Sequence, residues 1–195
     1  TISSTTTLTV SGTLTFDNSK GVSVTNVNTA AGTASGTIAA LGDVIFGDNI
    51  AEDEDYDGTV RLLINGSGNQ ILRGFMTSST GNMPTLEIDK SGGTLTLAGT
   101  IRFAPYTSAG RYWKYTAGTI DPASSTVVFA SDGGGTVTLS IQGTHTLGNI
   151  LFAALSSREL VAIVSSTTVL TASGTLVFDS TAGSNMTLNG NIIAA

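Results

Sequence analysis

The sequence contains no cysteine and a single histidine, His145. Without thiols, cysteine nucleophiles and thiolate zinc sites are excluded. Strand alternation across Gly143-Thr144-His145-Thr146-Leu147 places the imidazole on the outward, threonine-bearing side, where a lone histidine is usually inert. We therefore expect a protein that is not an enzyme and has no catalytic residues.

Charged residues are also scarce, at 11% of the chain, with a formal net charge of −6. The eight lysines and arginines are scattered singly, whereas phosphate binding needs clustered basic side chains. The chain has no run of 18 apolar residues, which a membrane-spanning helix would require. These features predict neither a nucleic-acid partner nor membrane insertion.

The chain is instead rich in threonine, β-branched residues and glycine, with 24 glycines in 195 residues. Short runs alternate between threonine and leucine, valine or phenylalanine, as in Thr13-Leu14-Thr15-Phe16 and Thr94-Leu95-Thr96-Leu97. A period of two puts the apolar side chains on one face of a strand. Glycines between the runs allow the tight corners that such short strands need.

The sequence also repeats itself. Residues 4–17 read STTTLTVSGTLTFD and residues 166–179 read STTVLTASGTLVFD, identical at 11 of 14 positions. A related segment ends at Phe103, so that Phe16, Phe103 and Phe178 mark similar points at spacings of 87 and 75 residues. Regular self-similarity of this kind indicates a repeat architecture.

These patterns predict an all-β fold, specifically a β-solenoid (parallel β-helix) built of repeats of about 75–87 residues. Each repeat would comprise about three coils of roughly 20–30 residues. We expect one continuous region: repeat 1 at about residues 4–85, repeat 2 at about 86–160, and a partial repeat 3 at about 161–195. The alternative is a string of tandem β-sandwich modules, which also suits this repeat length.

The first strand-like segment has no polar cap, and neither has the last. Soluble repeat proteins cover their ends, and bare strand edges recruit other chains. We therefore expect either an excerpt of a longer rod or a polymer whose units pair through their end strands, with an overlooked cap as the third alternative. The self-association strand would comprise Thr5, Thr7, Leu8, Val10, Leu14 and Phe16.

A resemblance accompanies these patterns. The segments Tyr115-Thr116-Ala117-Gly118-Thr119-Ile120-Asp121, Gly135-Thr136-Val137-Thr138-Leu139 and Gly143-Thr144-His145-Thr146-Leu147-Gly148-Asn149-Ile150 resemble the β-helical repeats of bacterial surface and secreted proteins. These include autotransporter-like and filamentous-haemagglutinin-like adhesins. Phage tail-fibre and extracellular filament repeats are similar in style. The resemblance implies an extracellular structural or adhesive role.

One acidic segment has metal-binding character. Asp53, Asp55 and Asp57, followed by Gly58, match the first half of a calcium loop, in which alternate carboxylates converge on one hard cation. The closing glutamate is missing, because Ile64 stands at the twelfth position. Calcium is thus the one cofactor that the sequence suggests, and a solvated acidic loop is the alternative.

One aromatic segment has the character of a contact surface. Tyr106, Tyr112, Trp113 and Tyr115 include the only tryptophan and three of the four tyrosines. On a strand, Trp113 and Tyr115 share one face while Tyr112 takes the other. Such residues are enriched where proteins meet partners or sugars. The alternatives are a glycan contact, a subunit contact, or burial of Trp113 and Tyr115 in the core.

Together these observations predict an extracellular or cell-surface structural protein. It would be a self-associating filament or fibre building block whose partners are copies of itself. The alternative function is an adhesin or phage tail-fibre segment that binds surface glycans.

Overall fold

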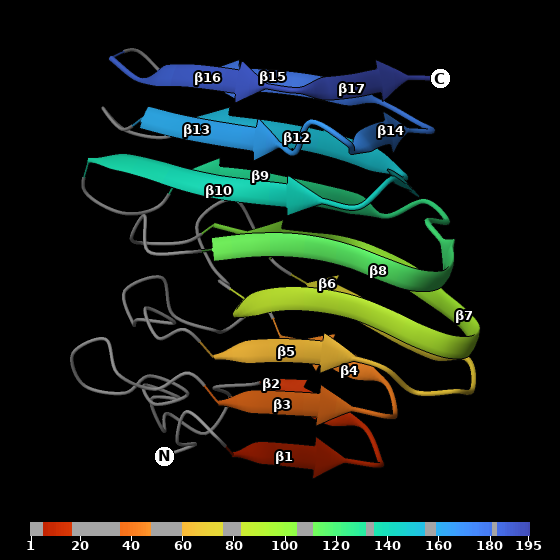
Figure 1. Ribbon diagram of the computed structural model, residues 1–195. Coiled ribbons are helices and arrows are strands. Elements are labelled where there is room, and N and C mark those ends of the chain that lie inside the picture. Colours follow the sequence, from red (N-terminus) through yellow and green to blue (C-terminus); the bar gives the residue numbers. More distant parts are fainter. Residues whose placement is uncertain are drawn as a thin grey trace.

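The structure, a computed structural model, describes residues 6–16, 36–47, 60–75, 83–104, 111–131, 135–154, 159–180 and 183–195. Every regular element in these ranges is a strand, and every pairing between them is parallel. The strands stack as coils along one axis, with β1 at one end and β16 and β17 at the other (Figure 1). The β-solenoid prediction is confirmed, and the β-sandwich alternative, which requires antiparallel sheets, is wrong.

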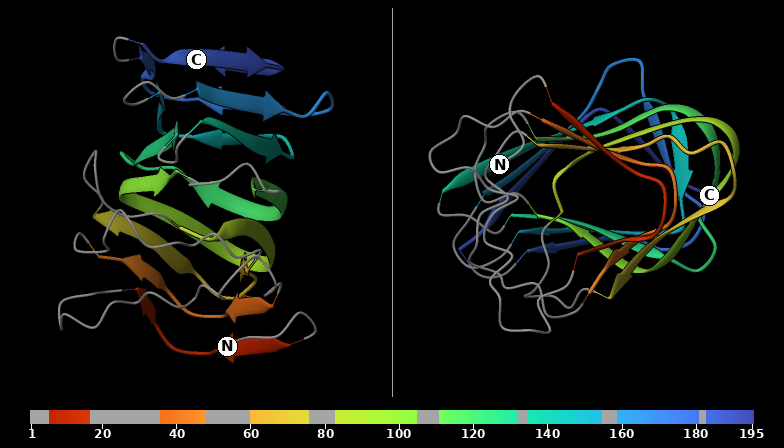
Figure 2. Two further views of the ribbon diagram at one scale, coloured as in Figure 1. Left: turned by 90° about the vertical axis from the view of Figure 1, so that its left-hand side faces the viewer. Right: turned by 90° about the horizontal axis from the view of Figure 1, so that it is seen from below.

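The coils present strand ladders on separate faces of the rod, as the view along the axis shows (Figure 2). The first ladder follows the order β1 (Thr7–Val10), β3 (Thr37–Ala40), β5 (Arg61–Ile64), β7 (Thr85–Phe103), β8 (Arg111–Asp121), β10 (Thr136–Gln142), β13 (Glu159–Val164) and β16 (Asn185–Asn189). The second contains β2 (Leu14–Phe16), β4 (Val44–Phe46), β6 (Gln70–Phe75), the end of β7, β9 (Thr126–Ser131), β12 (Asn149–Ala154) and β15 (Leu176–Ser180). A third, shorter ladder contains β11 (His145–Leu147), β14 (Val169–Ala172) and β17 (Asn191–Ala194).

The pairing registers give the length of each coil. Thr7 lies opposite Thr37, and Val169 lies opposite Asn191, so successive coils are 22 to 30 residues long. This range agrees with the coil length expected from the sequence. Within the described ranges, no helix has the length and apolar character that crossing a membrane would require.

The main apolar core runs through the rod, because the inward residues of each strand pack on their counterparts one coil away. A smaller buried cluster, separate from this core, comprises Ala104, Val128, Ala130 and Ala153. The clearest row of the main core is aromatic: Phe103, Phe129, Phe152 and Phe178 lie opposite one another in register. The Phe129 and Phe152 rings stack at 5.3 Å, and those of Phe152 and Phe178 at 5.7 Å. The 75-residue spacing between Phe103 and Phe178 therefore spans three coils.

Phe16 belongs to a different row, which the sequence alone does not distinguish. Its ring stacks on Phe46 at 4.5 Å, but the next two positions of that row are Gly74 and Gly99. Phe103 follows Gly99 by four residues within the same long strand, β7. The rows differ because the three coils that follow Phe16 are 30, 28 and 25 residues long and lead to Gly99, whereas the repeated motif places Phe103 four residues later.

Polar side chains close the corners between strands. Asp43, Asn69, Thr144 and Asn149 each accept a hydrogen bond from a backbone N–H of the next coil, at 2.8 to 3.1 Å. These amides lie just before the ladder-paired residues of β6, the second half of β7, β14 and β15. The corner side chains therefore link each coil to the following one where the strands cannot.

Candidate functional site

Several residues expected to form sites lie outside the described residues. These are the three aspartates of the calcium hypothesis, Asp53, Asp55 and Asp57, together with Tyr106 and Thr5. The calcium site therefore stays a prediction.

The remaining aromatic residues occupy β8 on opposite sides. Trp113 is fully buried, so it offers no surface to a glycan or a partner, and its place in the core corresponds to the third alternative. Tyr115, on the same side, is partly buried, and its hydroxyl donates a hydrogen bond to the Gly118 carbonyl at 2.6 Å. Tyr112, on the opposite side of the strand, is partly exposed, as Tyr115 is.

Trp113 takes part in a buried polar site with His145. The indole Nε1–H donates to His145 Nε2 at 3.1 Å, and His145 Nδ1 lies 2.6 Å from the Gly143 carbonyl oxygen. Because an indole can only donate, Nε2 must accept, and the imidazole proton must sit on Nδ1 and point to Gly143. The Tyr115 ring stacks on the imidazole at a centroid distance of 5.6 Å.

The expected outward position of His145 is therefore wrong, since only 6% of the residue is exposed. Gly143 turns the chain at the corner before β11 with a φ of +78°. Alternation continues through this corner, because Ile141, His145 and Leu147 are buried while Thr144 and Thr146 are exposed, so the imidazole lies on the side opposite the threonines. Burial lowers the pKa of His145 below its ordinary value of 6.5, and the hydrogen bond to the Gly143 carbonyl opposes this only in part.

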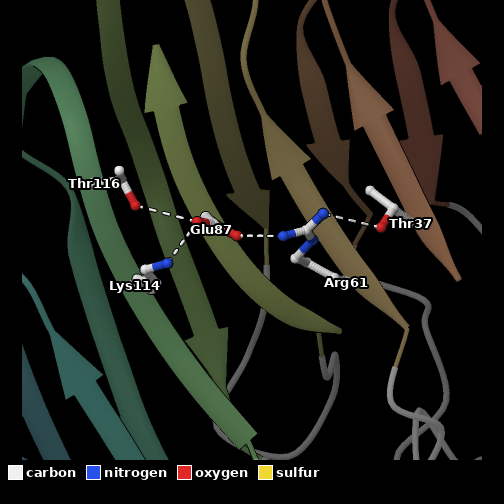
Figure 3. Close-up of polar contacts among 5 residues, drawn as sticks. All are labelled: Thr37, Arg61, Glu87, Lys114 and Thr116. Carbon is white, nitrogen blue, oxygen red and sulfur yellow. Dashed lines mark hydrogen bonds and ion pairs between the residues drawn. The ribbon is translucent and has the colours of Figure 1, made fainter. Parts of the chain in front are cut away.

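A second polar cluster lies on the outer face of the first ladder and centres on Glu87 of β7 (Figure 3). One carboxylate oxygen accepts from Arg61 of β5 at 2.6 Å, and the other accepts from Lys114 and Thr116 of β8 at 2.8 and 3.1 Å. Arg61 also donates to Thr37 of β3 at 3.2 Å. The cluster thus joins four successive coils along the rod.

The charges around Glu87 determine its ionisation. Burial alone would raise the pKa of Glu87, since only 8% of its side chain is exposed. The hydrogen bond and charge of Lys114, the hydroxyl of Thr116 and the charge of Arg61 outweigh burial and hold the pKa below 4.5. The carboxylate therefore contributes stability that is present above the unfolded pKa and is lost as the pH falls through the lower, folded value.

Glu87→Gln should lower the free energy of unfolding by about 1–3 kcal/mol at pH 7, because it removes charge-assisted hydrogen bonds from a buried group. Arg61 and Lys114 remain solvated in the variant, since about a third of each side chain is exposed, and this limits the loss. Urea denaturation followed by circular dichroism measures it. Glu159→Gln is the matched control, because Glu159 makes a solvent-exposed hydrogen bond to Thr136. Equal losses in the two variants would contradict the role of Glu87.

A buried lysine holds the corner below the Glu87 cluster. Lys90 is 3% exposed, and its ammonium group donates to the carbonyls of Gly66 and Gly68 and to Gln70 Oε1, at 2.6 to 2.9 Å. Three donors thus meet three neutral acceptors, and burial lowers the pKa of Lys90 below its ordinary value of 10.5. Gln70 in turn donates to the carbonyls of Ala40 and Gly42. The arrangement ties one corner to two preceding coils.

The strand edges at the two ends of the rod are the remaining candidate site. In the described part of the chain, no strand pairs with the outer side of β1 or with the outer sides of β15, β16 and β17. Leu8 is 49% exposed although Ile38, its register partner one coil inward, is 3% exposed. Phe178 is likewise 52% exposed, whereas Phe152 beneath it is fully buried.

The predicted self-association residues occupy this first coil. Thr7 is exposed, Leu8 has its apolar side uncovered, and Val10 and Leu14 are partly buried against the core. Phe16 differs, because it is 4% exposed beneath the end of the stack. The backbone edge is also defined: the carbonyls of Thr6 and Val10 accept from β3 and the following corner, so the amides of Thr7 and Thr9 point to the opposite, open side.

Comparisons with known proteins found no matching family model, no matching curated protein and no matching solved structure. The fold therefore defines the class of the molecule, a parallel β-solenoid.

The sequence patterns did not indicate a role for Glu87 or Lys90. The burial of Lys90 could have been predicted, because it follows Leu86 and Ile88 in the alternation that places side chains on the inward side of the strand.

Proposed function

We propose that this chain is a structural building block of an extracellular fibre, in which solenoids stack end to end by parallel strand pairing. The observation that carries the proposal is the contrast within single rows of the core. Leu8 and Phe178 are each about half exposed, while the residues one coil inward are almost completely buried. One further coil at either end would bury these side chains.

The two ends are complementary in kind. Among the described strands, each end has an unpaired backbone edge of a parallel ladder and an apolar interior, and such edges accept strands from other chains. The first-ladder edge of β16 at one end would meet β1 of a second copy at the other. Contact between two different ends does not close on itself, so it generates an open filament.

The central part of the chain is suited to a load-bearing role. The Glu87 cluster links four coils on the outer face, and Lys90 links the corners inside. Their separations of 20 to 29 residues along the sequence mean that each contact bridges neighbouring coils. The low charge, the lack of cysteine and the resemblance to bacterial surface repeats support an extracellular location.

The adhesin alternative has less support from the described residues. Trp113, the largest aromatic side chain of the proposed contact surface, is buried, and Tyr115 is partly covered. Tyr112 is partly exposed on the outer face of β8. Glycan binding without self-association would favour this alternative.

The assembly proposal predicts that Thr9→Pro weakens self-association at least tenfold while leaving the single chain folded. Proline removes the Thr9 amide, which faces the open edge of β1, and proline is tolerated at edges whose N–H faces solvent. Thr9→Val is the matched control, because it keeps the amide and the size of the side chain. Sedimentation velocity and light scattering across a concentration series measure the association.

The wild type and Thr9→Val should form particles whose mass grows with concentration, and Thr9→Pro should stay smaller. A wild type that remains a single chain at every concentration would contradict the proposal. So would a folded Thr9→Pro variant that assembles as well as Thr9→Val does.

A further inference from the structure

The buried His145 site has a property that does not depend on assembly. Both ring nitrogens are already committed, Nε2 to the indole N–H of Trp113 and Nδ1 to the Gly143 carbonyl. A second proton on the ring would have to sit on Nε2 and point at another N–H. Two donors would then face each other with no acceptor between them.

The neighbouring strands place no acidic side chain beside the ring: Asp121, the acid of β8, lies at the far end of that strand, opposite Thr96, and accepts a hydrogen bond from the Ala123 amide. β11 packs against β8 and β14, and His145 is the only ionisable residue in β11, while β14 contains none. On β8, Tyr115 stacks on the ring, Arg111 lies on the same side of the strand as Trp113, and Lys114 points to the outer face, where it pairs with Glu87. An imidazolium here would face the aromatic rings of Trp113 and Tyr115.

The corner that holds His145 is itself built from hydrogen bonds. The Gly143 amide donates to Thr168 Oγ1 at 2.8 Å, and Thr168 is fully buried beside Ser165. Gly143 thus connects the imidazole to the next coil, and Trp113 connects it to the preceding one. A change at His145 is transmitted to both neighbouring coils.

We propose that His145 is an acid-sensitive lock in the rod: its protonation breaks the hydrogen bond to Trp113 and loosens the packing of the coils formed by β8, β11 and β14. The proton comes from solvent, and no covalent bond changes. At pH values above this transition, the neutral imidazole holds the corner through its two hydrogen bonds. At pH values below it, the packing of this coil against its neighbours is loosened.

The direction in which pH changes the stability of the fold follows from linkage. Burial lowers the pKa of His145 in the folded chain, so the unfolded chain binds the proton more readily. The stability from this site is present above the unfolded pKa of 6.5 and is lost as the pH falls toward the folded value. Over that window the folding equilibrium constant should fall about tenfold per pH unit, the limit for a single proton.

The chain contains one tryptophan and one histidine, which makes the test direct. The indole ¹H–¹⁵N resonance and the fluorescence of Trp113 are followed from pH 7.5 to 5.0 in the full chain, above the range in which Glu87 titrates. The wild type should show a single-proton transition. His145→Gln should show none, because a glutamine amide offers both an acceptor for Trp113 and a donor for Gly143 without titrating. An unchanged Trp113 signal in the wild type, or the same transition in His145→Gln, would overturn the proposal.

A second variant keeps the test decisive if His145→Gln does not fold. Trp113→Phe removes the opposing donor and preserves an aromatic ring in the core. The pKa of His145, measured from its ring resonances, should then be higher than in the wild type, because Nε2 is free to take the proton. Equal pKa values in the two proteins would show that the indole does not act as the lock.

Discussion

Phe129→Ala is expected to lower the free energy of unfolding by about 3–5 kcal/mol, which is typical of removing a buried phenylalanine. Phe129 is fully buried at the centre of the aromatic core. Its ring contacts Trp113 and Phe103 edge-on at 5.6 and 6.3 Å and stacks on Phe152 at 5.3 Å. Alanine would leave a cavity that paired strands on both sides prevent from collapsing. Thermal and urea denaturation measure the loss.

Phe178→Ala is the matched control, because Phe178 belongs to the same row but lies in the last coil of that ladder, half exposed. Phe178→Ala should lower the free energy of unfolding by less than half as much as Phe129→Ala does, when the two are compared at a concentration where the chain does not assemble. At higher concentration Phe178→Ala should also weaken association, since its ring is part of the open end. Equal destabilisation by the two substitutions would contradict the described core.

Gly143→Ala is expected to cost more than about 2 kcal/mol. The φ of +78° alone costs a residue with a Cβ about 1–2 kcal/mol. In addition, a Cβ on Gly143 would overlap the carbonyl oxygen of Tyr115, which is part of the backbone and cannot rotate away. The same change would displace the Gly143 carbonyl from His145, so the indole resonance of Trp113 should shift as well.

Gly12→Ala provides the comparison, because it places the same substitution at another corner. A Cβ at Gly12 meets nothing within 4 Å, and its φ lies outside the left-handed region. We expect a change between zero and a stabilisation of about 1 kcal/mol, through the reduced freedom of the unfolded chain. If Gly143→Ala were as well tolerated as Gly12→Ala, the corner geometry would be wrong.

The fold class could be predicted from the sequence because it depends on local patterns. Alternation of threonine with leucine and phenylalanine, and glycine at the corners, indicated short strands, and the repeats indicated stacking. The register could not be predicted in the same way. Residues 4–17 and 166–179 are nearly identical in sequence, and the described parts of both segments form a strand, a corner and a second strand, but β1 belongs to the first ladder and β14 to the third.

The polar sites were harder to predict, because each joins residues about one coil apart. For His145 the alternation rule holds across Gly143 and places the imidazole with Leu147, opposite Thr144 and Thr146, so the expected outward position did not follow from it. Glu87, Arg61 and Lys114 form no motif in the sequence, because Arg61 and Lys114 lie 26 and 27 residues from Glu87, on two other strands. Only the register, which places Glu87 opposite Lys114 and beside Arg61, shows that they form one cluster.

Electron microscopy of the purified chain, with helical reconstruction of any filament, tests the central claim most directly. End-to-end stacking predicts filaments in which coils continue across the junction between copies, with β16 of one copy beside β1 of the next at the usual strand spacing of about 4.8 Å. Single particles one rod long at every concentration, or filaments joined through the lateral faces with both end edges exposed, would contradict it.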